Sequence, residues 1–322
     1  DDGMVPTDAD SYDKYTFSAR GSHKVKALTF SSSLNYSYQK NKFATTGQGL
    51  TMLNSLYQTP RDVSIISLQD QNDIFNSPGY FYTPYGVMNP YYILENYLNE
   101  YDAERFYGKF QVDYDFLKYF KFTYRMGLDT TTGQSNRGEP NLYALFYEGT
   151  PNGEGMGSNS PFYGKEGSYS QQITRRREIN QDLLLSFSMP INDFQINALA
   201  GFNGNERKYS YLYSSVSKLT IPTWYNLSNS AATPTVEQYL SLRRLMGVFG
   251  QVDLSWRNML YVTLTARNDW SSTLPKENCS FFYPSVSSSF LINEMVKLPK
   301  QISLLKLRAS WAQVGNDTEP YK

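Results

Sequence analysis

Hydrophobic and polar residues alternate one by one along many segments of this chain. Between residues 28 and 38 the even positions are apolar or aromatic apart from one serine, and the odd positions carry hydroxyl or amide groups. Successive side chains of a strand point to opposite faces, so this segment predicts a strand with one apolar and one polar face. One such strand fits any antiparallel sheet with a wet face. Many of them favour a transmembrane β-barrel with lipid outside and a polar lumen inside.

The alternation predicts ten strands separated by connections of two lengths. Their approximate bounds are 12–20, 25–40, 104–116, 119–129, 170–187, 194–208, 239–256, 259–270, 281–292 and 303–314. Short turns, the first expected at Gly21–His23, alternate with long loops, the first at 41–101, in which residues 47–57 are compatible with a short helix. Short periplasmic turns and long extracellular loops are typical of outer-membrane barrels. A soluble β-sandwich or an extended adhesin is the alternative that single strands fit equally well.

Composition narrows the function classes. The chain has 30 basic and 30 acidic residues, so no net charge draws it to nucleic acid. It has no run of about 18 apolar residues, which excludes a transmembrane helix but not a barrel, in which only alternate residues face lipid. The 28 tyrosines and 19 phenylalanines suit strands, membrane-interface girdles and sugar-facing surfaces.

Residues for catalysis or metal binding are scarce. The only histidine, His23, falls in a predicted turn, and the only cysteine, Cys279, has no histidine near it in sequence. Loop carboxylates such as Asp70, Asp73 and Glu154 form at most an unspecific calcium site. No glycine-rich phosphate loop is present. We therefore expect no enzyme, no catalytic residue, no metal and no cofactor.

Three strings near the end of the chain carry a family resemblance. Residues 261–272 are YVTLTARNDWSS, residues 282–287 are FYPSVS, and residues 305–317 are LKLRASWAQVGND. In this order they resemble the barrel of SusC/RagA-type TonB-dependent outer-membrane transporters of Bacteroidetes. Thr83–Tyr85 and Asn89–Tyr91 are also similar to that family.

The resemblance implies an all-β fold that is only part of a larger barrel. Family members have an N-terminal plug and a barrel of twenty-two strands. We therefore expect residues 1–322 to be a partial transmembrane antiparallel barrel of about ten strands, without the plug and the C-terminal strands, in the bacterial outer membrane.

The resemblance also implies a function and partners. The expected function is active import of oligosaccharides, with a SusD-like surface lipoprotein as a lid and the TonB–ExbB–ExbD system acting through the plug. The alternatives are peptide import by a RagA-like member, and a passive porin or surface β-protein without TonB coupling.

Two groups of residues are candidates for these roles. The first long loop, 41–101, is rich in aromatic residues. It is expected to bind substrate or contact the lid through Tyr80, Tyr82, Tyr85, Asn89, Tyr91 and Tyr92. The alternative is that these rings pack the loop against its neighbours or against the partner lipoprotein. The motif residues Arg267, Asp269, Pro284, Arg308, Gly315 and Asn316 are expected to hold strands and loop bases in place rather than to contact substrate.

Overall fold

The chain folds into one ten-stranded antiparallel sheet in which each strand pairs with its neighbours in sequence. The computed structural model describes residues 5, 7–78, 88–146, 162–296, 299, 301–315 and 318. The strands are β1 Ser11–Val25, β2 Leu28–Lys42, β3 Leu98–Phe116, β4 Phe120–Glu139, β5 Ser168–Ile191, β6 Phe194–Ser217, β7 Thr235–Trp256, β8 Leu260–Ser271, β9 Ser280–Leu291 and β10 Lys306–Ala312. The predicted number of strands and their up-and-down order are confirmed.

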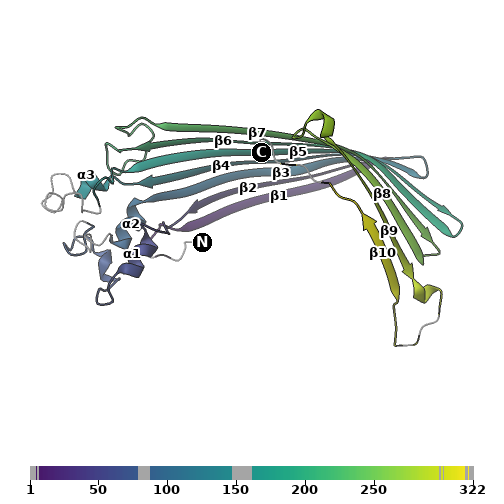
Figure 1. The fold of residues 1–322 in the computed structure, drawn as a ribbon, viewed down its shortest axis with the longest axis horizontal. Helices are drawn as coiled ribbons and strands as arrows, with labels where there is room; N and C mark the ends of the chain where they lie inside the picture. The colour runs from purple at the N-terminus through teal and green to yellow at the C-terminus, as the bar shows by residue number, and fades with distance from the viewer. Residues whose placement is uncertain are drawn as a thin grey trace.

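The sheet curves into an open arc, with β8 to β10 turned away from the plane of β1 to β7 (Figure 1). The helices of the long loops are α1 Met52–Gln58, η1 Ser67–Gln69, α2 Pro90–Asn96, α3 Leu142–Phe146 and η4 Lys276–Asn278, and η5 Ile292–Glu294 follows β9. In Figure 1, α1, α2 and α3 gather at one end of β1 to β7, and the short turns lie at the other. No helix among the described residues is long and apolar enough to cross a membrane.

The pairing register keeps apolar side chains together on one face and polar ones on the other. Phe122 of β4 lies opposite Tyr114 of β3 and Leu185 of β5. One position away, Thr123 lies opposite Asp113. The apolar face is uncovered over the middle of the sheet, since Leu185 is 42% and Val248 50% exposed. A contiguous apolar face of this extent is a lipid-facing surface.

Aromatic and charged residues mark the two limits of the apolar band. At the turn end, Phe120 packs against Phe187 with ring centroids 5.0 Å apart. At the loop end, on the same face, Glu206 accepts hydrogen bonds from Arg177 Nη2 at 2.9 Å and Arg244 Nε at 2.8 Å. Between these limits β5 provides nine residues, Ile179–Phe187, which matches the length that a tilted strand needs to cross a bilayer.

Several strands are longer than the alternation predicts. β4 and β6 continue to Glu139 and Ser217, and β5 already begins at Ser168, so the expected loops at 130–169 and 209–238 are shorter than predicted. These extensions lie beyond the apolar band and mostly lack an apolar face, so alternation cannot reveal them. Backbone hydrogen bonds continue the ladder all the same.

The first turn was also predicted at the wrong place. Gly21–His23 lie inside β1, where His23 pairs with Phe30 of β2. The chain turns instead at Lys26 and Ala27, and Lys26 has the positive φ of 52° that a tight turn requires. The short helix expected at 47–57 is present as α1, Met52–Gln58.

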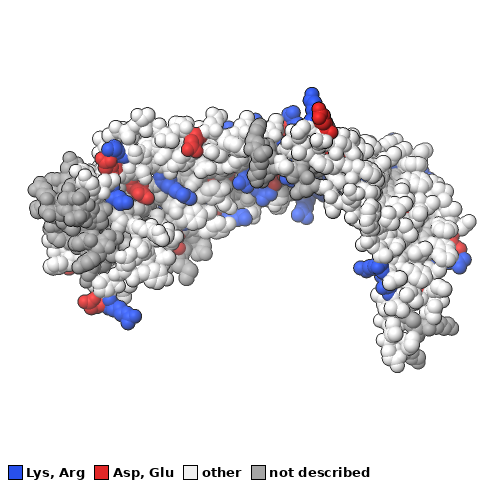
Figure 2. All heavy atoms as spheres, viewed as in Figure 1, with Lys and Arg blue, Asp and Glu red and all other residues white. Residues whose placement is uncertain are grey.

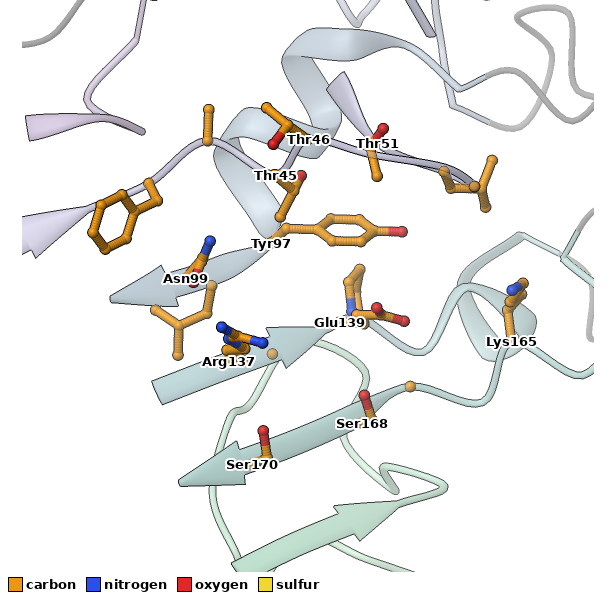
Figure 3. Close-up of a pocket in the computed structure, with 18 of the residues that line it drawn as sticks. Thr45, Thr46, Thr51, Tyr97, Asn99, Arg137, Glu139, Lys165, Ser168 and Ser170 are labelled. Atoms are coloured by element: carbon orange, nitrogen blue, oxygen red, sulfur yellow. The ribbon is translucent and has the colours of Figure 1, made fainter. Parts of the chain in front are cut away.

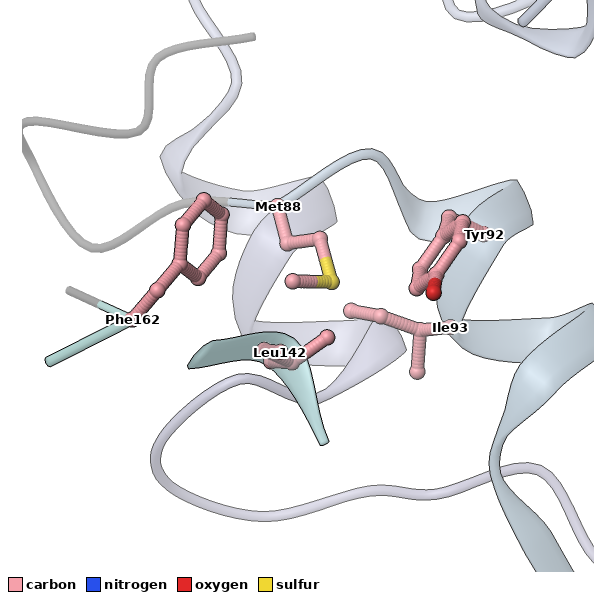
Figure 4. Packing of buried hydrophobic residues seen from close by; sticks show 5 residues of the cluster. All are labelled: Met88, Tyr92, Ile93, Leu142 and Phe162. Carbon is pink, nitrogen blue, oxygen red and sulfur yellow. The ribbon is translucent and has the colours of Figure 1, made fainter. Parts of the chain in front are cut away.

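A buried apolar cluster lies in the long loops. It joins α2 and Met88, which precedes it, to α3 and residue 162 through the side chains of Met88, Tyr92, Ile93, Leu142 and Phe162 (Figure 4). Burial raises the pKa of Tyr92 to about 12, so its hydroxyl is neutral. A second cluster, Tyr169, Val216 and Leu219, is covered by Tyr225 of the β6–β7 loop. The described parts of the long loops therefore pack into buried clusters at one end of the sheet.

Charged side chains occupy little of the surface on the side seen in Figure 2, where they lie in small groups, several with both signs together. This distribution agrees with the exposed apolar side chains on one face of the sheet.

We predict that the two faces of β7 respond oppositely to charge. Val252→Arg places a cation on the apolar face and should lower the stability of the folded protein by about 2–4 kcal/mol if the residue lies near the bilayer midplane. Gln251→Arg places the same charge on the polar face, where Gln251 already contacts Asp253, and should be tolerated. Assembly in the outer membrane, followed by heat-modifiable gel mobility, measures both. Equal tolerance would show that the apolar face is not exposed to lipid.

We also predict that loops and turns reach opposite compartments. Ile66 in the first long loop is 81% exposed and Leu117 in the β3–β4 turn is 78% exposed, so each accepts a single cysteine in a Cys279→Ser background. A membrane-impermeant maleimide added to intact cells should label Ile66→Cys and should label Leu117→Cys only after the cells are opened. The reverse pattern would invert the orientation of every strand.

Candidate functional site

The polar face of the sheet is lined by hydrogen-bonded carboxylates and amides. Asp113 accepts hydrogen bonds from Thr123 Oγ1 at 2.6 Å and from Gln111 Nε2 at 2.9 Å. Asp253 repeats the pattern on β7, where it accepts a hydrogen bond from Thr263 Oγ1 at 2.6 Å. Because these contacts link neighbouring strands on one face, they form a hydrophilic wall of the kind that faces a polar lumen.

A hollow of about 900 Å³ opens on this face at the base of the long loops (Figure 3). Residues 43–51 form one side of it, and the start of β3, the end of β4 and the start of β5 form the rest. Its polar lining comprises Thr45, Thr46, Gln48, Thr51, Tyr97, Asn99, Tyr101, Ser135, Arg137, Glu139, Lys165, Ser168 and Ser170. Hydroxyls, an amide and charges of both signs can bind a solute rich in hydrogen-bonding groups.

Tyr97, one of two tyrosines that line this hollow, lies where α2 meets β3. Tyr97 ends α2, and its backbone N–H donates to the carbonyl of Ile93. Burial, together with the nearby Glu139 carboxylate, raises the pKa of Tyr97. Hydrophobic alternation does not predict this hollow, because Arg137, Glu139 and Ser168 fall in a predicted loop, whereas the structure places them in the paired strands β4 and β5.

The predicted loop residues that the structure describes are buried. Asn89 is 0% exposed and caps α2 by accepting the backbone N–H of Tyr91 at 2.9 Å. Its Nδ2 donates to the carbonyls of Leu68 at 2.8 Å and Asn76 at 2.7 Å. Tyr91 and Tyr92 are 7% and 9% exposed. These three side chains brace the loop, and their expected role toward substrate or lid stays a prediction. Tyr80, Tyr82 and Tyr85 lie outside the described residues.

The motif residues Arg267 and Asp269 form a cluster on the polar face of β8. Arg267 Nε donates to Asp269 Oδ1 at 2.7 Å, and the Tyr283 hydroxyl donates to Oδ2 of the same carboxylate. The guanidinium also lies 5.4 Å from the ring centre of Phe249. Gly247 lies directly opposite Asp269, and a Cβ there would come within 2.1 Å of the carboxylate. The missing side chain makes room for the cluster.

The other motif residues lie around the last strand pair. Pro284 is at the end of the β9–β10 pairing, where its carbonyl accepts the backbone N–H of Gln313 and its missing N–H is tolerated. Gly315 lies against the ring of Tyr283. Arg308 is exposed on β10, and Asn316 lies outside the described residues. The expectation that this group holds strands in place stays a prediction.

A metal centre has no support in the part of the chain that the structure describes, because no three His, Cys, Asp or Glu side chains gather there. Asp73 instead caps a turn by accepting the backbone N–H of Phe75 at 2.9 Å. Asp70 does the same for Asn72 at 3.2 Å.

Comparison with known proteins gives relatives in sequence and in fold. No family model matches the chain. It is 24% identical over 284 residues to TonB-dependent receptor P3 of Formosa agariphila, covering 86% of this chain and 26% of that protein. It is 27% identical over 176 residues to TonB-dependent receptor P26 of the same organism, covering 51% of this chain and 18% of that protein. The chain thus spans about a quarter or less of these relatives.

Solved structures agree on the fold. A structure titled the RagAB peptide importer in the closed-closed state superposes with a TM-score of 0.74 at 16% identity, covering 96% of this chain and 33% of that one. A second structure, titled the RagAB peptide transporter, gives a TM-score of 0.72 at 14% identity over 94% and 33% of the two chains. At this identity the likeness concerns the fold.

We predict that the Arg267–Asp269 cluster depends on the glycine beneath it. Gly247→Ala should displace the Asp269 carboxylate and destabilise the barrel by about 1–3 kcal/mol, as overpacking does. Gly204→Ala is the matched control in β6, since a Cβ there meets only the edge of Phe202 at 3.7 Å. The temperature of the heat-modifiable gel shift measures both. An unchanged temperature for Gly247→Ala would show that the cluster adapts freely.

Sequence relatives, the strand order and the two faces of the sheet agree with one another. The resemblance to TonB-dependent transporters, expected from the motifs, is confirmed by the two TonB-dependent receptors among the sequence relatives, and the RagAB structures share the fold. The chain is a portion of an outer-membrane antiparallel β-barrel similar to the barrels of TonB-dependent receptors.

Proposed function

We propose that this chain is part of the wall and loops of a transporter that actively imports oligosaccharides across the bacterial outer membrane. The proposal rests on the two faces of the sheet. One face is apolar and uncovered, and the opposite face of the same strands is polar and hydrogen-bonded. One sheet that faces lipid on one side and polar solute on the other is suited to line a passage.

The proposal includes further parts of the transporter and its partner proteins. A plug and further strands, outside residues 1–322, complete the barrel; a SusD-like surface lipoprotein covers the loop end; and TonB–ExbB–ExbD act on the plug. Tyr80, Tyr82 and Tyr85 bind substrate or contact the lid, and the buried Asn89, Tyr91 and Tyr92 brace the described part of the first long loop. The hollow at the base of the long loops receives the solute.

Peptide import is the second candidate, and the likeness in fold to a protein titled a peptide importer favours it. We place oligosaccharides first because hydroxyl, amide and tyrosine groups dominate the lining around Thr45, Tyr97 and Ser168. A passive porin or a surface β-protein without TonB coupling is the third candidate.

Uptake by whole cells distinguishes these candidates. We expect cells that carry the gene to accumulate fluorescent oligosaccharides, and cells with the gene deleted, with tonB deleted or with the proton-motive force collapsed by an ionophore to lose that uptake. Fluorescent peptides of similar size are supplied in parallel. Accumulation of peptides alone would overturn the substrate class but keep TonB coupling. Uptake that survives the ionophore and the tonB deletion would show a passive channel.

A further inference from the structure

Arginines and tyrosines from four strands, β3, β5, β6 and β7, line a second hollow on the polar face, to which β4 adds Asp129 and Thr131. Cross-strand pairing aligns one row, Arg105, Thr131, Arg176, Tyr209 and Ser241, from β3 to β7. The adjacent row is Tyr107, Asp129, Glu178, Arg207 and Arg243. Directly opposed side chains on one face lie within contact distance. The rows line most of a hollow of about 860 Å³, here called the arginine–tyrosine hollow.

The carboxylates of these rows are already engaged by arginines. Arg105 binds Asp129 through two hydrogen bonds, Nε–Oδ1 at 3.0 Å and Nη2–Oδ2 at 2.6 Å. Arg207 Nε donates to Glu178 Oε1 at 3.0 Å. The two rows hold four arginines against two carboxylates, so their formal charge is +2. A surplus of positive charge in a concave polar site attracts an anion.

The arrangement of the arginines works against a purely structural role. Arg207 of β6 lies directly opposite Arg243 of β7, and like charges at opposed positions destabilise a sheet. The guanidinium of Arg176 lies over the ring of Tyr209, 5.3 Å from the ring centre. The Arg176 side chain is exposed to the hollow.

Three tyrosines form a platform beside these arginines. Tyr211 stacks on Tyr239 with ring centres 5.6 Å apart, and Tyr209 lies 6.1 Å from Tyr239 and 6.2 Å from Tyr211. Tyr239 remains 37% exposed. Tyrosine offers an apolar ring face together with a polar hydroxyl, a combination that suits a sugar ring with its apolar C–H face and its hydroxyls.

We propose that the arginine–tyrosine hollow binds an anionic sugar, a uronate or a sulfated residue, of the oligosaccharide that this transporter imports. The inference rests on the proposed function and assigns its substrate class. The tyrosine platform contacts the sugar ring, and Arg176 and Arg243 bind its carboxylate or sulfate. A guanidinium presents a planar fork of donors that matches either anion. The platform favours a saccharide over an acidic peptide, which offers carboxylates but no rings.

The test measures binding to the whole protein purified from outer membranes in detergent. Calorimetry compares alginate oligosaccharides, which carry carboxylates, with carrageenan oligosaccharides, which carry sulfates. Maltooligosaccharides of matched length are the neutral probe, and oligo-glutamate is the peptide probe. We expect one or both anionic saccharides to bind more tightly than the other two probes, with an affinity that falls as salt rises.

Variants then place the binding in this hollow. Arg176→Gln and Arg243→Gln should each weaken anionic saccharide binding about tenfold, the size expected for loss of one charge-assisted hydrogen bond, while Arg176→Lys should keep part of it. Arg175→Gln is the matched control, because Arg175 is the exposed neighbour on the opposite face of β5. Heat-modifiable mobility confirms that each variant is folded.

Four results would overturn the proposal. They are equal binding of neutral and anionic saccharides, preferential binding of oligo-glutamate, an effect of Arg175→Gln as large as that of Arg176→Gln, and binding of no probe. The uptake experiment separates these failures from the proposed function, because TonB-dependent accumulation of a neutral oligosaccharide would uphold import while rejecting an anionic substrate.

Discussion

The cross-strand register of the single sheet is the constraint on which the rest of the structure depends. A slip of one residue between β3 and β4 would move Phe122 to the polar face and Thr123 to the apolar one. It would also separate Asp113 from the Thr123 hydroxyl that donates to it. Paired residues on neighbouring strands point to the same face of the sheet. A slip of one residue would therefore place the polar and charged side chains of a whole strand on the lipid-facing side.

The short turns hold this register, and they do so with strained backbone. Leu117, Asn192 and Arg257 have positive φ values of 58°, 49° and 48° in the connections that follow β3, β5 and β7. A positive φ is costly for leucine and arginine and less so for asparagine. Each residue sits where two paired strands end within a few positions of one another, so the ladders on either side impose the conformation.

At the loop end of the apolar band, charged side chains lie on both faces of the sheet. On the apolar side Glu206 is shared by Arg177 and Arg244. On the polar side the neighbouring positions Glu178, Arg207 and Arg243 form part of the arginine–tyrosine hollow. The two charge groups lie on opposite faces of the same segments because side chains alternate. Both faces therefore carry charged groups at the loop end of the apolar band.

The sequence by itself determined the features that follow from local alternation. The ten strands, their faces and the alternation of short and long connections are visible because membrane-spanning residues such as Val248 and Val252 must be apolar at every second position. The motif strings also carried the family resemblance, since they are contiguous in the chain.

Only the tertiary structure decided the rest. The extensions of β4, β5 and β6 carry little apolar alternation, so their strands exist because a paired neighbour continues the ladder. Asn89, a candidate for binding substrate or lid in the sequence, is buried, and its Nδ2 donates to carbonyls of residues 13 and 21 positions away. The arginine–tyrosine hollow draws Arg105, Arg176 and Arg243 from three strands. Local sequence patterns do not predict that these distant residues become neighbours, because the register of the whole sheet sets which residues are paired.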